Sequence, residues 1–369
     1  MPFVGKRLEL ARTFRGLNQT ALGEAVSASA GFLSLVENEK RVPSSDLTDA
    51  LGEVLGFRPE YFFRPLIDPF TEADANFRRR ATTPKRLRER VLAHGTLIGE
   101  IVRYLHAHIV LPTYDVPQLG SRSERDPEWA AEFCREHWGL GLAAPILTLG
   151  RVVERAGVFL IELDAQSQKV DAFSRFGDVS VIVLNRTKGS TSRTLFDIAH
   201  ELGHLVLHRV VPITEANRED EANKFAAAFL LPKAGFTQDF LSLRRLDWPH
   251  LFELKRHWRV SLAAILYRAY TLQLLDAVGY RRLVQQMYAR GWNRGEPVEP
   301  TEERPELLQM AFNTLLSENK VTASRIASDL GWELSTVADV TGLPLADQSP
   351  EPSGVFSLCA YRERRRGAA

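Results

Sequence analysis

The stretch that most restricts how this chain can fold is Thr194–His208, TLFDIAHELGHLVLH. It holds His200, Glu201 and His204 in the order H-E-x-x-H. Residues four apart lie one above the other on a helix face, so both imidazoles can reach one ion. Glu201 projects about 100° round the helix and can approach water beside the ion rather than the ion itself. The spacing therefore predicts a helix with two metal ligands and a general base.

The apolar context of this helix favours a metal site over a chance match to the motif. Apolar residues surround the two His and predict that the helix is largely buried: Leu195, Ile198, Ala199, Leu202, Leu205 and Val206. Burying two His and a Glu without a partner costs free energy, whereas a bound ion would satisfy them. A catalytic zinc site also needs a third protein ligand and an open position for water.

The run EDEANKFAAAFLLP, which begins at Glu219, supplies a candidate for the third ligand. It reads as a second helix that stops at Pro232, with Asn223 on the same face as Glu219. Asn223 can then hold a ligand His in orientation. Glu221 is the rival ligand, but it points to a different face.

Two further positions restrict the type of site. Val210 excludes the variant with a third His six residues after the second. His208 continues the stripe by one turn, and we interpret it as a structural residue or as a partner of a ligand rather than as a ligand.

The two runs AHELGHLVLH and EDEANKFAAAFLLP resemble the ImmA/IrrE family of metallopeptidases, over about residues 140–300. Members of that family are bacterial proteins that cleave transcriptional repressors. The resemblance implies an α+β zincin-like domain with a small mixed sheet, in which His200, His204 and Glu219 bind the metal and Glu201 is the catalytic carboxylate. Zn²⁺ is favoured by this ligand set, while Mn²⁺ or Fe²⁺ can also occupy a His₂Glu site.

Charge, cysteine content and the lengths of apolar runs restrict the class of protein in which such a site would work. The formal net charge is +1, so any contact with nucleic acid must come from local patches. Cys134 and Cys359 are far apart and do not form a disulfide framework. With no signal-peptide core and no apolar run of membrane-spanning length, we expect a soluble, cytoplasmic protein that does not contact membranes.

Residues 5–64 predict a compact cluster of short helices. The expected elements are a first helix ending at Gly16, a short helix Gln19–Val26 capped by Asn18, a turn near Ser27, a helix ending near Glu37, and a helix Asp46–Leu55 closed by Gly56. Two short helices joined by a tight turn inside such a cluster are the helix-turn-helix arrangement.

The sequence of this segment, NQTALGEAV followed by GFLSLVENEKRVPS, resembles the XRE (phage-repressor-like) family. The resemblance implies DNA contacts from Gln19, Ser27, Ser29, Phe32, Asn38, Lys40 and Arg41. Ser27 and Glu39 depart from the family pattern, because each stands where the family usually has Gly. The unit is also neutral, with eight Lys/Arg and eight Asp/Glu over residues 1–64, so a monomer should bind DNA weakly. A protein-contacting module is the alternative.

The rest of the chain reads as a linker, a catalytic domain and an extension. Residues 69–110 hold a basic run that is either a solvated face or a phosphate clamp, followed by a long helix from Arg86 to Ile109. Three strand-like runs precede the helix that carries the H-E-x-x-H motif (the metal helix): Val158–Leu163, Val170–Phe176 and Val179–Leu184. The last is either an edge strand that aligns an extended substrate by backbone hydrogen bonds, as in metallopeptidases of this general build, or a plain core strand. Tyr267 and Arg268 are candidates to steady an oxyanion.

We therefore predict four parts: an XRE-type helix-turn-helix domain (1–68), a basic linker with a connecting helix (69–110), an ImmA/IrrE-like metallopeptidase domain (111–298) and a helical C-terminal extension (299–369). The predicted function is a transcriptional regulator with zinc-dependent endopeptidase activity, which cuts a repressor-type protein in a stress or phage-related response. Its expected partners are DNA, the protein substrate and a second copy of the chain. The alternative is a DNA-binding transcription factor whose peptidase-like domain senses a ligand or metal without turnover.

Overall fold

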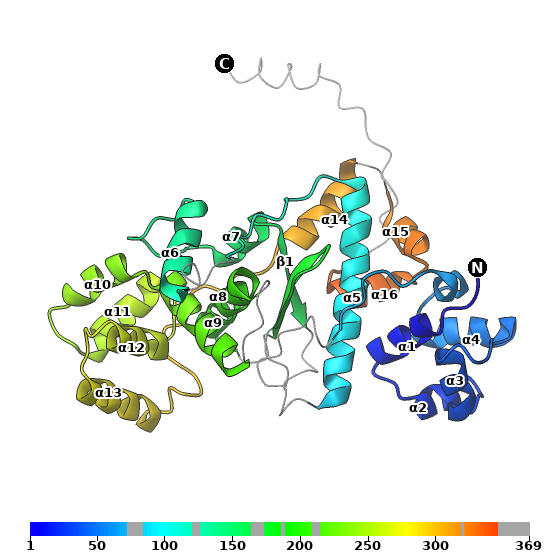
Figure 1. Ribbon diagram of the computed structural model, residues 1–369, viewed down its shortest axis with the longest axis horizontal. Helices are drawn as coiled ribbons and strands as arrows, with labels where there is room; N and C mark the ends of the chain where they lie inside the picture. Colours follow the sequence, from blue (N-terminus) through cyan, green and yellow to red (C-terminus); the bar gives the residue numbers. More distant parts are fainter. Residues whose placement is uncertain are drawn as a thin grey trace, which may run out of the picture.

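A computed structural model describes residues 1–71, 84–119, 126–163, 173–185, 189–208, 215–318 and 321–345. Within these residues the chain forms sixteen α-helices, one short 3₁₀ helix and three strands. In the described ranges, the model has no helix long and apolar enough to cross a bilayer. The molecule is elongated, with the N-terminal helices at one end and helices α10 to α13 at the other (Figure 1).

The sheet lies between these two ends. It contains β1 (Val158–Leu163), β3 (Ser180–Asn185) and β2 (Phe173–Arg175) in the order β1-β3-β2. Strand β3 runs parallel to β1 and antiparallel to β2. Of the two readings of Val179–Leu184, the edge strand is therefore wrong and the core strand is confirmed, because β3 is hydrogen-bonded on both sides. Only part of the predicted run Val170–Phe176 becomes a strand, and residues 170–172 lie outside the described residues.

The alternation of side chains along the strands divides the molecule into two cores. Phe159, Ile161 and Val181 face the N-terminal end, where they join a cluster with helix α5 (Lys85–His108) and helix α14 (Leu307–Glu318). Leu160 and Ile182 face the opposite way and join the cluster that contains the metal helix. Both faces of the sheet are buried, which explains the continuous apolar run VSVIVL.

The first core includes the N-terminal unit, which consists of α1 (Gly5–Phe14), α2 (Gln19–Ala25), α3 (Ala30–Glu37), α4 (Ser45–Leu55) and the 3₁₀ helix η1 (Pro59–Phe63). Asn18 caps α2 and Gly56 ends α4 with a left-handed conformation, as predicted. Ser27 and Glu39, the two departures from the family's Gly positions, have φ of 53° and 59°. The backbone therefore requires the left-handed region at both positions, at some cost in strain.

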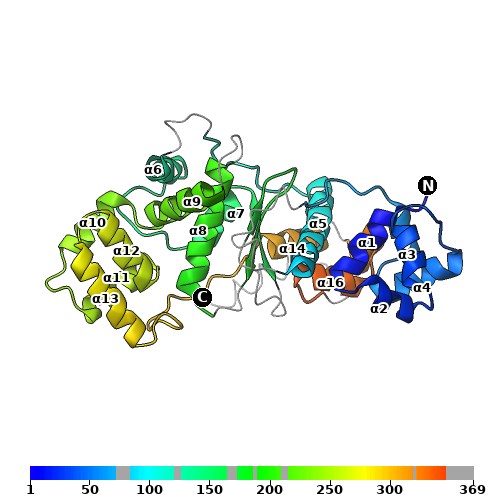
Figure 2. The ribbon, with the colours of Figure 1, turned by 60° about the horizontal axis from the view of Figure 1, so that its bottom comes forward.

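The C-terminal helices α14, α15 (Ala323–Leu330) and α16 (Leu334–Thr341) pack against α5 and the N-terminal unit rather than projecting away from the molecule (Figures 1 and 2). Phe57 and Trp332 form an isolated antiparallel bridge, and both side chains are buried. Arg15 donates hydrogen bonds to Thr336 and Asp339. Chain segments that are up to 324 residues apart thus build one core.

The second core holds helices on the other side of the sheet. They are α6 (Pro127–His137), α7 (Leu149–Arg155), α8 (Thr191–Leu207), α9 (Glu215–Leu230), α10 (Lys233–Leu241), α11 (Trp248–Trp258), α12 (Leu262–Thr271) and α13 (Ala277–Ala289). Helices α8 and α9 pack closely along their length. Gly203 makes this approach possible, because a Cβ there would lie 3.0 Å from the Phe225 ring.

A strap formed by residues 296–306 joins the two ends of the molecule. Its carboxylates bind the N-termini of helices: Glu296 accepts from the Leu262 N–H of α12, Glu299 from the Ser192 N–H of α8, and Glu303 from the Gly150 N–H of α7. Carboxylates are stabilised at helix N-termini, where unpaired N–H groups and the helix dipole attract negative charge. This charged strap is therefore held at the N-terminal ends of three helices.

Candidate functional site

Helix α8 carries the H-E-x-x-H motif, and its N-terminus is fixed by two groups. The Ser190 hydroxyl accepts from the Arg193 N–H and so acts as N-cap. The carboxylate of Glu299 accepts from both the N–H and the hydroxyl of Ser192. Glu299 also binds the buried Lys255, whose Nζ lies 2.7 Å from it and 2.6 Å from Glu296. This network sets the position of the motif.

Three side chains converge at the middle of α8 and the start of α9. The Nε2 atoms of His200 and His204 lie 3.1 Å apart. The carboxylate of Glu219 approaches both rings, at 3.3 Å from His204 Nε2 and 3.6 Å from His200 Nε2. His200, Glu201 and His204 offer ligand atoms that all lie within 4.8 Å of one another, and all three are buried. The predicted ligand residues are thus brought together.

The outer nitrogens of the two rings are held by hydrogen bonds. His200 Nδ1 lies 3.0 Å from Asn223 Oδ1, so the amide oxygen accepts the ring proton. His204 Nδ1 lies 2.8 Å from His208 Nδ1, and His208 Nε2 lies 3.1 Å from the carboxylate of Glu221. If each ring carries one proton, Glu221 accepts from His208 and His208 accepts from His204. Both His200 and His204 then present an unprotonated Nε2 to the same point.

Glu201 lies on the side of α8 that faces the sheet. Burial raises the pKa of its carboxyl to about 7, while the His200 ring and the Ser174 hydroxyl of β2 act in the opposite direction. Its Oε2 atom is buried and has no hydrogen-bond partner among the described residues. A carboxyl group with a pKa near neutrality can both accept and release a proton at physiological pH.

The pKa values of the neighbouring groups are shifted in the directions expected of metal ligands. Burial lowers the pKa of His204 to about 4, which keeps the ring neutral. Burial alone would raise the pKa of Glu219, but its hydrogen bonds to His200 and His204 outweigh that effect and lower it well below the usual range. Neutral imidazoles and an ionised carboxylate are the forms that bind a divalent cation.

The distances allow a test of whether these residues fit a metal ion. Zn–N and Zn–O bonds of about 2.0–2.2 Å in a tetrahedron place neighbouring donor atoms about 3.3–3.5 Å apart. The three distances among His200 Nε2, His204 Nε2 and Glu219, at 3.1, 3.3 and 3.6 Å, are close to that spacing. A carboxylate oxygen of Glu201 lies within 4.8 Å of a ring nitrogen of His200 and of His204. The donor set therefore fits a divalent cation with one position left open.

The two oxyanion candidates have different surroundings. Tyr267 is 43% exposed and lines a cavity that also contains Asn223. Arg268 is buried and points elsewhere, because its guanidinium binds both carboxylate oxygens of Glu128 and the carbonyl oxygen of Leu231. Since the whole fork is engaged between α6 and α12, Arg268 is not available to a substrate. The prediction that Arg268 steadies an oxyanion is therefore wrong.

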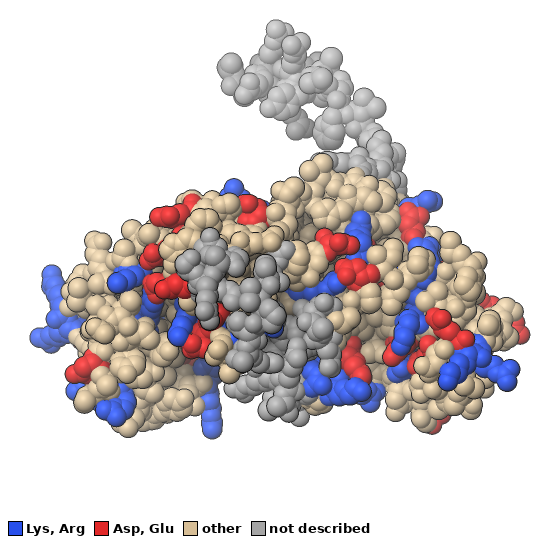
Figure 3. Space-filling view, viewed as in Figure 1, with Lys and Arg blue, Asp and Glu red and all other residues tan. Residues whose placement is uncertain are grey.

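Most cations of the N-terminal unit are used inside the molecule. Five arginines bind groups of the protein: Arg7 to Glu100, Arg12 to Glu37, Arg15 to Asp339, Arg58 to Ser328, and Arg64 to the Asp329 carbonyl oxygen. Lys6 pairs with Glu9. Only Lys40 and Arg41 of this unit form neither a side-chain hydrogen bond nor an ion pair with any described residue. Lys/Arg and Asp/Glu are interspersed over the face shown in Figure 3.

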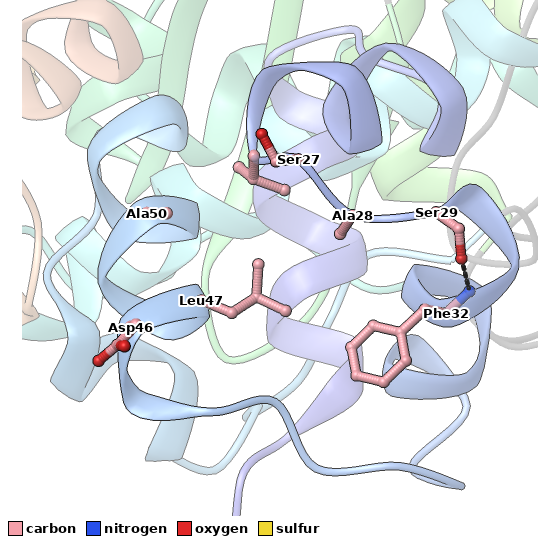
Figure 4. Close-up of a pocket in the computed structure, with 8 residues that line it drawn as sticks. Ser27, Ala28, Ser29, Phe32, Asp46, Leu47 and Ala50 are labelled. Atoms are coloured by element: carbon pink, nitrogen blue, oxygen red, sulfur yellow. Dashed lines mark hydrogen bonds between the residues drawn. The ribbon is translucent and has the colours of Figure 1, made fainter.

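The other predicted DNA-contacting residues lie around α3. Ser29 caps α3 by accepting from the Phe32 N–H, and Asn38 ends it with its amide bound to the Ser34 carbonyl oxygen. The side-chain amide of Gln19, which was expected to contact DNA, donates to the carboxylate of Glu37 and is therefore already engaged inside the unit. Ser27, Ser29 and Phe32 line a shallow groove of about 550 Å³ between α3 and α4 (Figure 4). The groove contains Asp46 and no Lys or Arg.

The structure describes only part of the predicted basic run, the part that lies in the first turns of α5. Arg86 donates to the Gly16 carbonyl oxygen, and Arg90 donates to the Phe14 carbonyl oxygen, so both bind the C-terminal end of α1. Cations are favoured there by the helix dipole. Residues 78–80 lie outside the described residues. For Arg86 and Arg90, the contacts tie α5 to the N-terminal unit instead of leaving the side chains as a phosphate clamp.

The mixed sheet, the paired helices α8 and α9 and the buried His/Glu group define a metallopeptidase-like domain. Residues 153–270, from the end of α7 to α12, match a family model described as the IrrE N-terminal-like domain, Peptidase_M78. A comparison with curated proteins gave no match. The matched segment contains the candidate metal group, which consists of His200, Glu201, His204 and Glu219. It also contains Asn223 and Tyr267.

Proposed function

We propose that this chain is a divalent-metal-dependent endopeptidase, with His200, His204 and Glu219 as ligands and zinc as the preferred ion. The near-tetrahedral spacing of these three donors beside the buried carboxyl of Glu201 carries the proposal. When bound, the ion supplies Lewis acidity toward water and the substrate carbonyl. Glu201 accepts a proton from the attacking water and delivers it to the leaving amine, which its pKa of about 7 permits. Tyr267 is the candidate donor to the developing oxyanion.

We also propose that the substrate is a repressor-type protein and that the N-terminal unit contacts DNA through α3, as part of a stress or phage-related response. The resemblance to the XRE family and the exposed Lys40 and Arg41 support this reading. A dimer would place two such units on a two-fold operator. The alternative is a regulator whose peptidase-like domain senses a ligand or metal without hydrolysis.

A Glu201→Gln variant separates the two readings. The endopeptidase reading expects a loss of about 10²–10⁴-fold in hydrolysis, because a proton acceptor is removed, while metal content measured by elemental analysis is unchanged. Proteomic comparison of cells with the wild-type chain and the variant would then show one protein cut only by the wild type. If the regulatory effect in cells is undiminished in the variant, the sensor reading replaces the enzymatic one.

A further inference from the structure

Helix α6 carries a row of three aromatic rings on its outer surface, and we call this row the α6 stripe. The ring of Phe133 stacks against the two others, with its centroid 5.2 Å from that of Trp129 and 6.3 Å from that of His137. The residues are four positions apart, so they lie on one face of the helix. Trp129 and Phe133 are 42% and 38% exposed. Apolar side chains that are exposed together, rather than singly, are typical of an interaction surface.

The opposite face of α6 attaches the stripe to the domain that contains the metal group. Ala130 and Cys134 are fully buried, and α6 packs along α9, the helix that carries Glu219. Glu128, in the first turn of α6, binds the guanidinium of Arg268 on α12. Figures 1 and 2 show α6 at the surface beside α9. A polypeptide bound to the α6 stripe is therefore tethered to the same domain as the metal group, and a tether raises the effective concentration of a linked cleavage site.

Two carboxylates lie along one side of the stripe. Glu132 follows Trp129 by three positions on the helix. Glu136 follows Phe133 by the same interval, so each carboxylate lies next to a ring. Within the residues that the structure describes, neither carboxylate forms an ion pair or a side-chain hydrogen bond. Arg135 is the only Lys or Arg of α6, and it is buried with its guanidinium bound to three carbonyl oxygens. The negative charge beside the rings is therefore left unpaired.

These charges restrict the chemistry of a partner. His137, at the end of the stripe, lies 2.8 Å from the carboxylate of Asp115 and so adds no free positive charge. Nucleic acid and acidic polypeptides are excluded from this surface, because their charges would face Glu132 and Glu136. An uncharged apolar segment would bury the rings but would leave both carboxylates desolvated and unpaired. Lys and Arg fit both features, since their aliphatic stems pack on rings while their charged heads reach carboxylates.

We propose that the α6 stripe, together with Glu132 and Glu136, binds a basic amphipathic segment of the protein substrate away from the bond that is cut. A repressor-type substrate offers such a segment, because binding DNA requires Lys and Arg. The inference rests on the proposed endopeptidase function and adds a second contact with its substrate. Helix α6 (Pro127–His137) lies outside residues 153–270, so the family match does not assign this surface.

Binding is measured by fluorescence anisotropy of a labelled amphipathic peptide that presents Leu on one helical face and Arg on the other. The parent protein is the full-length zinc-loaded chain with Glu201→Gln, so that a bound peptide is not cut. We expect Trp129→Ala/Phe133→Ala to weaken binding by about tenfold, because it removes the aromatic anchors. Glu132→Gln/Glu136→Gln should weaken binding to a similar extent, because it removes the partners of the Arg side chains. The same peptide with Glu in place of every Arg should not bind measurably.

Two variants at other surfaces serve as matched controls. Tyr288→Ala removes a ring that is 60% exposed on α13, and Glu24→Gln/Glu53→Gln removes two exposed carboxylates of the N-terminal unit. Both should keep the affinity of the parent chain. The Gln pair at Glu132 and Glu136 changes only charge, so it tests the stripe even if the Ala pair does not fold.

Cleavage provides a second readout once the substrate has been identified as the protein cut by the wild type and spared by Glu201→Gln. In the active chain, Trp129→Ala/Phe133→Ala should raise KM for the intact substrate by about tenfold and leave kcat unchanged, since it removes a contact made equally before and during the reaction. A short peptide that spans the cleavage site and lacks the basic segment should be cut at the same rate by both chains. An unchanged KM would separate the bound segment from the substrate and overturn the proposal.

The outcomes also separate this proposal from the proposed function. Equal affinity of the parent chain and both stripe variants overturns the stripe proposal alone. Loss of binding in the Gln pair but not in the Ala pair reduces the contact to general charge attraction and overturns it as well. A lower sedimentation mass of Trp129→Ala/Phe133→Ala than of the parent chain would make the stripe an interface between two copies instead. If binding depends on the stripe but the wild type cuts no protein, the proposed function fails, and the assignment of the bound segment to a substrate is overturned with it.

Discussion

The Nδ1 atoms of His204 and His208 lie 2.8 Å apart, so the two rings share one proton. Through this contact His208 is a hydrogen-bond partner of His204, one of the two roles that its place one turn further along the helix indicated. Because Glu221 lies 3.1 Å from the other nitrogen of His208, the proton is directed to the Nδ1 side of His204, and Nε2 is left free. Partners of this kind orient a ligand and raise its basicity.

Replacing His208 should weaken metal binding without removing a ligand. We expect His208→Phe to lower zinc affinity by about 10–100-fold, and Glu221→Gln to lower it less, since the amide oxygen can still accept from His208. Competition with a chromophoric chelator measures both affinities, and ¹⁵N shifts of the His204 ring report its tautomer. Unchanged affinity in His208→Phe would reduce the contact to a packing role.

Glu219 is predicted to be the third ligand, and its neighbour Asp220 serves as the control. Glu219→Ala removes a donor at 3.3 Å from His204 Nε2, so we expect at least 10²-fold weaker zinc binding and loss of hydrolysis. Asp220→Ala removes an exposed carboxylate on the same helix and should leave zinc affinity within about twofold. Calorimetric titration of zinc into both variants checks this. Full affinity in Glu219→Ala would move the third ligand to another residue.

Lys255 should be important for stability, because it is fully buried between Glu296 and Glu299. Lys255→Met leaves two carboxylates without their cation, and breaking a buried pair in this way costs about 3–5 kcal/mol in the free energy of unfolding. Lys233→Met, at an exposed position, should change it by less than about 0.5 kcal/mol. Urea unfolding followed by circular dichroism compares them. Equal midpoints for the two variants would contradict the structural role of the strap.

Stability should fall in mild acid because of His94, which donates from Nε2 to the Val340 carbonyl oxygen at 2.7 Å and so joins α5 to α16. Burial lowers the pKa of His94 below its ordinary 6.5, assisted by Arg90 and opposed by the Val340 contact and Asp339. Below pH 6.5 the unfolded chain takes up a proton that the folded chain resists. The contribution is therefore present above that pH and is lost as pH falls, by up to about 1.4 kcal/mol per pH unit.

His94→Gln keeps a donor to Val340 but does not titrate. Thermal unfolding between about pH 5 and 8 should show a smaller decline in acid for this variant than for the wild type. A second variant, His106→Gln on the exposed part of α5, is the control and should keep most of the decline. Parallel curves for wild type and His94→Gln would assign the acid sensitivity to other groups.

DNA binding by the N-terminal unit should be weak and only mildly dependent on salt. Only Lys40 and Arg41 are left for phosphate once the internal contacts of the other cations are counted. If about two phosphates are neutralised, the plot of log affinity against log salt concentration has a slope of about −2. Fluorescence anisotropy on a labelled duplex measures this slope, and Lys40→Ala/Arg41→Ala should bring it close to zero. A wild-type slope steeper than about −5 would mean that other cations reach DNA.

Much of the local structure could be predicted from the sequence. The H-E-x-x-H spacing, the Asn18 cap, the Gly56 stop and strand β1 (Val158–Leu163) all depend on residues within a few positions of one another. The helical period of 3.6 and the rules for helix ends act over that same range. The pairing of Glu219 with Asn223 on one face followed from the same period. The choice between an edge and a core position for β3 stayed open, because the partners of a strand are not encoded in the strand itself.

The remaining features of the site depend on contacts between segments that are far apart in the chain. The approach of Glu219 to the two imidazoles requires α8 and α9 to pack at Gly203, and the partner of Arg268 lies 140 residues away at Glu128. The docking of α16 on the N-terminal unit and the binding of Glu299 at the start of α8 join segments more than 100 residues apart. Such contacts form because burial and charge pairing are satisfied jointly, and no local pattern records which distant partner satisfies them. Residue types and their local spacing indicate which side chains can hold a metal, whereas the packing of the whole chain brings some of them together.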